Sequence, residues 1–308
     1  MTTSCTLSVL ICTHNRHQLL DRALHTLIEC TEGKPDQVVV VNGGDERADR
    51  VVRSFKGRHQ IDIRLLKTTN KNLAASRNVG VPHCTGDIVA MTDDDAEVSP
   101  DWVLQMKRVH AEHPEAGAVG GAVTGIDSGH NLTSRLADIV TFRSLPRACD
   151  VRTVPGVNVS YKREVITRVG PQDEMLFRGE DVDYNWRVKR LGYQVYYDPA
   201  IKVAHHHRSS LSQFLHQHHM YGRAYYLVRK KWPDMYCIYP HGFTRPRDVL
   251  KAINVFASII YKPLRQAREL ASIRDRLLGY PILIATQLVW KGGMLRQRVA
   301  EWRPKSTT

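Results

Sequence analysis

The chain has 308 residues, of which 42% are hydrophobic and 24% are charged. This composition excludes disordered and fibrous proteins and is typical of a globular domain with an appendage. The six cysteines form no C-x-x-C pair, which argues against a redox motif, a zinc cage and a secreted disulfide framework. The net charge of +13 is concentrated in residues 211–308, which hold 17 Lys and Arg against 5 Asp and Glu.

Short apolar segments alternate with helical patterns in the first part of the chain. Strands are predicted at residues 7–12, 37–41, 61–66 and 86–91, with helices after the first and third of them. This alternation predicts an α/β fold, in which a mostly parallel, Rossmann-like sheet is flanked by helices. Ligands of such sheets bind at the carboxyl ends of the strands.

Polar residues follow three of the predicted strands. They are Thr13, Asn15 and Arg16 after the first strand, Asn42 after the second, and Asp93, Asp94 and Asp95 after the fourth. Because the carboxyl ends of parallel strands meet at one edge of a sheet, we expect these side chains to form a nucleotide site.

The run Asp93, Asp94 and Asp95 is a candidate metal site. Adjacent carboxylates repel one another, and a hard cation such as Mg²⁺ or Mn²⁺ would neutralise them and still bind substrate phosphates. A solvated turn or a helix cap is the alternative. We favour the metal because the run directly follows a buried strand. One imidazole of residues 205–207 could complete the site, and in an extended stretch His205 and His207 share a side.

A second acidic centre is formed by Glu180 and Asp181 at the start of a predicted helix that ends near Gly192. One of these carboxylates is expected to act as a general base that takes a proton from an acceptor hydroxyl. Ordinary complementation of the helix dipole is the alternative. A base at this position needs burial or neighbouring acids to raise its pKa.

Six motifs occur in a fixed order over roughly the first two hundred residues. They are ICTHNR (residues 11–16), VVNGGD (40–45), NLAASRNVG (72–80), GDIVAMTDDD (86–95), GVNVSYKRE (156–164) and GEDVDYNWRVKRLGY (179–193). Together they resemble the family 2 glycosyltransferases, which have the GT-A fold and transfer sugars with inversion. Their joint occurrence is far more specific than any one motif.

The resemblance implies a role for each candidate residue. The nucleotide-sugar site would comprise Thr13, Asn15, Arg16, Asn42, Arg77, Asp93 and Asp94; the Mg²⁺ or Mn²⁺ ligands would be Asp95 and His205; and Asp181, beside Glu180, would be the catalytic base. Relatives commonly carry an acidic residue near Asn42 that contacts uracil. The Asn42 amide oxygen could still accept a hydrogen bond from uracil, so a UDP-sugar is the expected first choice. An amide also donates, so GDP- and dTDP-sugars stay open.

Two domains are expected. A GT-A catalytic domain would span residues 1–210, with a nucleotide-sugar-binding half at 1–125 and an acceptor and catalytic half at 126–210. A helical basic tail would follow at 211–308. The expected activity is glycosyl transfer, of hexosyltransferase type, to a sugar or lipid-linked acceptor, in the synthesis of cell-surface polysaccharide, glycolipid or a related glycoconjugate.

Two alternatives remain. A nucleotidyltransferase would need a glycine-rich phosphate loop, which residues 13–16 do not form. The second alternative is a non-catalytic basic protein that binds a membrane surface or nucleic acid. It does not explain the two acidic centres.

The basic tail at residues 211–308 has the pattern of a segment that binds a surface. An apolar stripe of helical spacing lies between its basic residues, at Val249, Ile253, Phe256, Ile260 and Leu264. A neutral body with such a tail favours an anionic membrane surface over nucleic acid, and a solubilising surface is the alternative. With no recognisable signal peptide, we expect a cytoplasmic protein whose tail docks on the inner face of the cell membrane.

Overall fold

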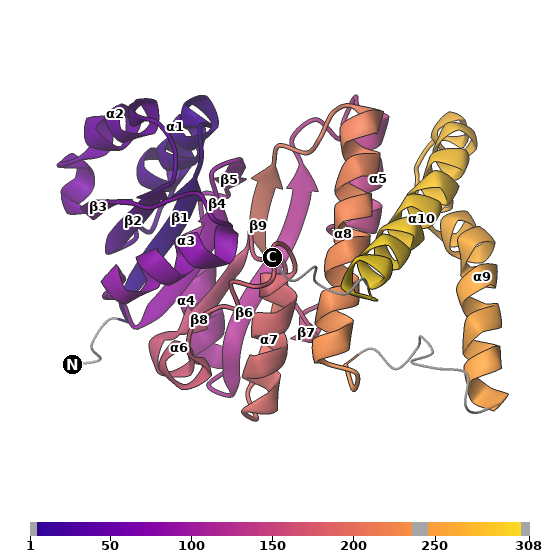
Figure 1. Ribbon diagram of the computed structural model, residues 1–308. Helices are drawn as coiled ribbons and strands as arrows, with labels where there is room; N and C mark the ends of the chain where they lie inside the picture. Colours follow the sequence, from indigo (N-terminus) through magenta and orange to yellow (C-terminus); the bar gives the residue numbers. More distant parts are fainter. Residues whose placement is uncertain (1–4, 236–245, 303–308) are drawn as a thin grey trace, which may run out of the picture. The chain divides into compact units, whose positions relative to one another are not determined.

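The computed structural model describes residues 5–235 and 246–302 (Figure 1). The chain divides into two compact units. Unit 1 comprises residues 1–126 and 142–206, and unit 2 comprises residues 127–141 and 207–308.

Unit 1 is built on a sheet that has nine strands in the described residues. The strands are β1 (Leu7–Thr13), β2 (Gln37–Asn42), β3 (Asp62–Lys67), β4 (Ile88–Asp93), β5 (Ala96–Val98), β6 (Ala116–Gly125), β7 (Cys149–Asp150), β8 (Val159–Lys162) and β9 (Gln194–His205). Their order is β3-β2-β1-β4-β8-β6-β9-β5, with β7 paired to β9. The first four strands pair in parallel, as predicted.

The second half of the sheet departs from simple β-α alternation. Strand β8 is antiparallel to both β4 and β6, whereas β6 and β9 are parallel. Strands β5 and β7 each pair antiparallel with β9. The α/β class and the flanking helices are confirmed, and the antiparallel strands are features that the apolar periodicity did not indicate.

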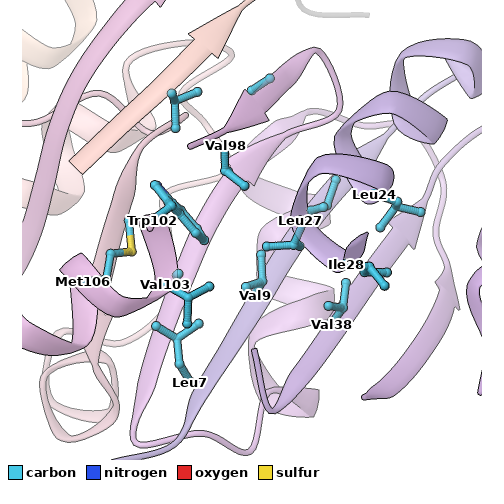
Figure 2. Close-up of a cluster of buried hydrophobic side chains, with 14 of the residues drawn as sticks. Leu7, Val9, Leu24, Leu27, Ile28, Val38, Val98, Trp102, Val103 and Met106 are labelled. Atoms are coloured by element: carbon cyan, nitrogen blue, oxygen red, sulfur yellow. The ribbon is translucent and has the colours of Figure 1, made fainter. Parts of the chain in front are cut away.

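Helices cover both faces of the sheet. On one face lie α1 (His17–His25), α2 (Glu46–Phe55) and α4 (Trp102–Glu112), and on the other α3 (Leu73–Gly80), α6 (Arg163–Val169) and α7 (Glu180–Arg190). Successive strand residues supply the two cores, because side chains alternate across a strand. Val9 thus packs with Leu27 and Trp102 in the core of Figure 2, whereas Leu10 packs in the core of the opposite face.

Unit 2 is helical. It contains α5 (Leu132–Val140), α8 (Leu211–Lys231), α9 (Pro246–Ala267) and α10 (Ile273–Trp302), as Figure 1 shows. The core includes Leu136, Phe214 and Leu283. Helices α8 and α10 cross closely, since a Cβ on Gly222 would lie 1.9 Å from the Trp290 carbonyl oxygen. The predicted helical extension is confirmed. Among the described residues, no helix combines the length and hydropathy that a membrane crossing requires.

A buried histidine in unit 1 gives a pH-dependent stability. The His110 ring on α4 lies with Nε2 2.9 Å from Ser160 Oγ, and burial lowers the pKa of His110 to about 3. In the unfolded chain, His110 has a pKa near its ordinary value of 6.5 and binds a proton as the pH falls below that value. In the folded chain the buried ring stays neutral until about pH 3, so the lower pH favours the unfolded chain. We expect the free energy of unfolding to decrease below about pH 6.5, by up to about 1.4 kcal/mol per pH unit from this group.

Urea titrations between pH 7 and pH 4.5 measure this effect. His110→Gln removes the titrating ring and should flatten the pH dependence relative to the wild type. His83→Gln, which changes a ring outside the described cores, is the matched control and should leave the slope unchanged. An equal slope in the wild type and His110→Gln would contradict the assignment.

Candidate active site

The parallel half of the sheet brings the predicted strand-end residues to one edge. Thr13 of β1 is the register partner of Asn42 of β2, and Cys12 is the partner of Asp93 on β4. Thr13, Asn42 and Asp93 therefore end neighbouring strands, as the pattern of polar loops indicated. The residues that follow each strand determine the chemistry of this edge.

Arg16 and Thr13 contact the acidic run. Arg16 Nη1 donates to Asp94 Oδ1 at 3.0 Å and to Asp95 Oδ2 at 2.6 Å, and Thr13 Oγ1 donates to Asp94 Oδ2 at 2.7 Å. Burial raises the pKa of Asp94 to about 6, although the Arg16 charge opposes that shift. The run is therefore a buried acidic group that requires positive charge, not a solvated turn.

Asp93, Asp95 and His205 form a set of donors that could hold a metal ion. One ligand atom from each lies within 4.8 Å of the others. The β5–β9 pairing produces this arrangement, because it places His205 opposite Ala96 and His205 Nε2 3.2 Å from Asp95 Oδ1. Two carboxylates and an imidazole suit Mg²⁺ or Mn²⁺. The resemblance implied Asp93 for the nucleotide-sugar site and Asp95 with His205 for the metal, so the place of Asp93 among these donors is an addition.

The neighbouring histidines have other partners. His206 Nε2 lies 3.0 Å from Glu97 Oε1, and His207 Nε2 lies 2.8 Å from Asp138 Oδ1 within unit 2. Of the three consecutive imidazoles, His205 is thus the one that meets the acidic run.

Arg77 links the two acidic centres. Its buried guanidinium reaches Asp93 Oδ1 and Glu180 Oε1, each at 3.3 Å, and donates to the Gly156 carbonyl oxygen at 3.0 Å. Burial disfavours the charged guanidinium, yet Asp93 and Glu180 hold the pKa of Arg77 above its ordinary value. Helix α3, capped by the Asn72 side chain, carries Arg77 into this position.

Glu180 and Asp181 occupy different surroundings at the start of α7. Glu180 is buried, and burial together with the Asp181 charge raises the pKa of Glu180, against the effect of Arg77. Asp181 is half-buried, with Oδ2 accepting from the Gly156 amide at 2.9 Å and Oδ1 from the Val182 amide at 2.8 Å. Burial, which raises the pKa of a carboxylate, thus acts on Glu180. Asp181 is the carboxylate that is more accessible to an acceptor.

Asn15 and Asn42 shape the turn after β2. The buried Asn42 amide donates to Asp49 Oδ1 at 2.7 Å and to the Asp45 carbonyl at 2.8 Å, and its oxygen accepts from the Gly44 amide at 2.7 Å. Asn15 has a φ of 56° and accepts from the Asp45 amide at 2.9 Å. Both side chains therefore hold the backbone where the nucleotide site was predicted.

Gly156 is a site residue to which the sequence analysis gave no role. Its carbonyl oxygen accepts from Arg77 and its amide donates to Asp181, so one residue contacts both the linking arginine and the second acidic centre. A Cβ at this position would lie 2.9 Å from Arg77 Nη1 and 3.1 Å from Asp181 Cβ. The glycine in the GVN motif was the signal, because a glycine often marks a close approach of backbone.

We expect Gly156→Ala to displace the Arg77 guanidinium, which its carboxylate partners hold in place. Overpacking of this kind costs about 1–3 kcal/mol of folding stability and should also impair binding at the site. Urea denaturation measures the first effect. Gly129→Ala is the matched control, because a Cβ there meets nothing within 4 Å. Equal stability of the two variants would show that Arg77 moves freely.

The family model described as Glycosyl transferase family 2 matches residues 8–170 of the chain. The chain belongs to glycosyl transferase family 2. The match spans the parallel strands, the acidic run and Gly156, and it ends before Glu180. The predicted family is confirmed, and it favours a glycosyltransferase over the nucleotidyltransferase and the non-catalytic alternatives.

Two curated glycosyltransferases are similar in sequence to part of this chain. A glucosyl-dolichyl phosphate glucuronosyltransferase of Haloferax volcanii is 31% identical over 180 residues, which cover 54% of this chain and 55% of the relative. A pre-mycofactocin glycosyltransferase of Mycobacterium tuberculosis is 30% identical over 188 residues, 58% of this chain and 40% of the relative. The match thus spans about half of each relative or less.

Solved structures of glycosyltransferases share the fold. A mannosyltransferase of Pyrobaculum calidifontis, in complex with GDP-mannose and Mn²⁺, has a TM-score of 0.67 at 17% identity and covers 99% of this chain and 89% of its own. GalNAc-T7, solved with UDP, GalNAc and Mn²⁺, has a TM-score of 0.54 at 14% identity and covers 92% of this chain and 59% of its own. The GT-A fold predicted from the motifs is confirmed.

Proposed function

We propose that this chain transfers a sugar from a nucleotide diphosphate sugar to an acceptor hydroxyl, by a single displacement that inverts the anomeric centre. The observation that carries the proposal is the pair of acidic centres joined through Arg77, which lies 3.3 Å from both Asp93 and Glu180. Glycosyl transfer separates a diphosphate from an oxocarbenium-like carbon, so it needs positive charge on one side and a base on the other. The first centre would supply the positive charge through a bound cation, and the second would supply the base.

The donor side comprises the strand-end residues. Asp95 and His205, with Asp93 as a further donor atom, would hold Mg²⁺ or Mn²⁺. When bound, such a cation supplies charge neutralisation for the departing diphosphate. Arg16 would contribute a second positive charge here, since it already lies within hydrogen-bond distance of Asp94 and Asp95.

The nucleotide would lie along the same edge. We assign its contacts to Thr13, Asn15, Arg16, Asn42, Arg77, Asp93 and Asp94. Because internal hydrogen bonds occupy the Asn42 amide, its contribution would be to hold the turn at residues 42–45.

Asp181 is our candidate for the base. It is more exposed than Glu180, so an acceptor hydroxyl can approach it, and two backbone amides fix its orientation. Glu180 pairs with Arg77 and would act by positioning that guanidinium.

The donor and acceptor are proposed by class. A UDP-sugar is our first choice, and GDP- and dTDP-sugars are the next candidates; the Pyrobaculum structure holds GDP-mannose and GalNAc-T7 holds UDP. The name of the Haloferax protein contains glucosyl-dolichyl phosphate. The name of a Methanococcus voltae protein, which is 22% identical over 300 residues, contains dolichyl N-acetyl-α-D-glucosaminyl phosphate. We therefore favour a lipid-linked acceptor in glycoconjugate synthesis, at the inner face of the cell membrane.

A screen of UDP-, GDP- and dTDP-sugars, read by release of nucleoside diphosphate, tests the proposal. Hydrolysis or transfer from one donor is expected with Mn²⁺, and EDTA should abolish it. Activity that persists in EDTA, or no release from any donor with Mn²⁺, would contradict a metal-dependent transferase.

A further inference from the structure

Helix α9 presents its apolar face to solvent. The apolar stripe that the sequence predicts on this helix has exposed fractions of 58% at Ile253, 71% at Phe256 and 61% at Ile260. In a globular protein an apolar stripe normally faces the core. The α9 stripe has the reverse orientation.

The opposite side of α9 packs within unit 2, where Ala267 joins the core. Ser258 is 2% exposed, and its Oγ accepts a hydrogen bond from Lys291 Nζ of α10 at 3.2 Å. The helix thus turns a serine toward its neighbour and an aromatic ring outward. This orientation leaves a continuous apolar face, defined here as Ile253, Phe256, Ile260 and Leu264, without a partner among the described residues of unit 2.

Further exposed apolar side chains follow the turn after α9. At the start of α10, Ile273 and Leu277 have exposed fractions of 74% and 72%. Exposed arginines stand beside them in the chain, at Arg265, Arg268 and Arg274. Residues 246–268 contain five basic residues and one acidic residue, Asp248. Large apolar side chains therefore project from a region of net positive charge.

We propose that the α9 face, together with Ile273 and Leu277 of α10, docks this protein in the plane of an anionic lipid surface. Apolar side chains would enter the boundary between headgroups and acyl chains, and the arginines would meet the anionic headgroups. A second copy of the chain fits less well. A two-fold contact through this face would set the same basic residues against one another.

Docking does not depend on the donor, and its role in catalysis rests on the lipid-linked acceptor proposed above. A lipid-linked acceptor is confined to a membrane surface, so a docked enzyme meets it at high local concentration. Donor hydrolysis in solution needs no vesicles, so failure of docking and failure of the proposed function are separate results.

Vesicle flotation of the full chain tests the proposal. Binding is expected to vesicles of phosphatidylcholine with 30% phosphatidylserine, to weaken with added salt, and to be absent with phosphatidylcholine alone. The double variant Phe256→Ser/Ile260→Ser should lower binding at least tenfold. Leu104→Ser, which changes an exposed apolar side chain of unit 1, is the matched control and should bind as the wild type does.

Three results would overturn the proposal. They are no binding to the anionic vesicles, equal binding by the double variant, and a wild-type dimer in light scattering that the double variant converts to a monomer. The last would assign the face to a second copy. Thermal melting of each variant reports its folding, and the side chains changed are exposed, so little loss of stability is expected.

Discussion

Asp181→Asn is expected to lower the rate of sugar transfer by about 10²–10⁴-fold, the range that a general base contributes. The amide keeps the size of the carboxylate, and its oxygen can still accept from the Gly156 amide. It cannot take a proton from an acceptor hydroxyl. Nucleotide binding in the presence of Mn²⁺ should stay within twofold of the wild type, because Asp181 is neither a proposed metal ligand nor a proposed nucleotide contact.

Single-turnover transfer and calorimetric nucleotide binding measure these two quantities separately. Glu180→Gln is the matched variant, since Glu180 neighbours Asp181 but touches Arg77 at 3.3 Å. It should weaken nucleotide binding along with transfer, because Arg77 loses a charged partner. If Asp181→Asn loses nucleotide binding and transfer together, Asp181 belongs to the donor site, and its assignment as the base alone is wrong.

Asp95→Asn should lower the affinity for Mn²⁺ by more than about 100-fold, beyond the 10–100-fold typical of a lost outer partner of a metal ligand. The change removes a charged oxygen from a set of donors that lies within 4.8 Å. It also removes the charged oxygen that Arg16 contacts at 2.6 Å and leaves Asp94, at 3.0 Å, as the charged partner of Arg16. Donor hydrolysis should be lost with the metal.

Titration of Mn²⁺ by electron paramagnetic resonance, in the presence of nucleoside diphosphate, gives the affinity. Glu97→Gln is the matched control. Glu97 also pairs with a histidine, at 3.0 Å from His206, and lies two residues from Asp95, yet it is outside the donor set. Equal losses in both variants would indicate a general effect of charge on this edge and would contradict the assignment of Asp95.

The parallel half of the fold was predictable because its signals are local. Continuous apolar runs such as residues 37–41 specify buried strands, and polar residues after them specify the ligand edge. The structure then places Thr13 beside Asn42 and Cys12 beside Asp93 by strand register alone. The helix starts at Leu73 and Glu180 were likewise indicated by their neighbouring residues.

The contacts that join the centres were less accessible to sequence reasoning. Arg77 and Glu180 are 103 positions apart, and Gly156 contacts Arg77 across 79 positions. Such pairs depend on the order of strands, and the antiparallel placement of β8 carries no periodicity signal. The apolar stripe of α9 was predicted from its spacing, but such a stripe specifies a helix face and not whether that face meets protein or solvent.

Pulsed electron paramagnetic resonance of Mn²⁺ bound with nucleoside diphosphate tests most directly whether this edge holds a metal and a donor together. The spectra should show nitrogen coupling from the His205 imidazole and phosphorus coupling from the diphosphate. In His205→Gln the nitrogen coupling should vanish while the phosphorus coupling remains. Nitrogen coupling that persists in His205→Gln, or wild-type spectra without phosphorus coupling, would contradict a metal site that joins Asp95 and His205 to the donor.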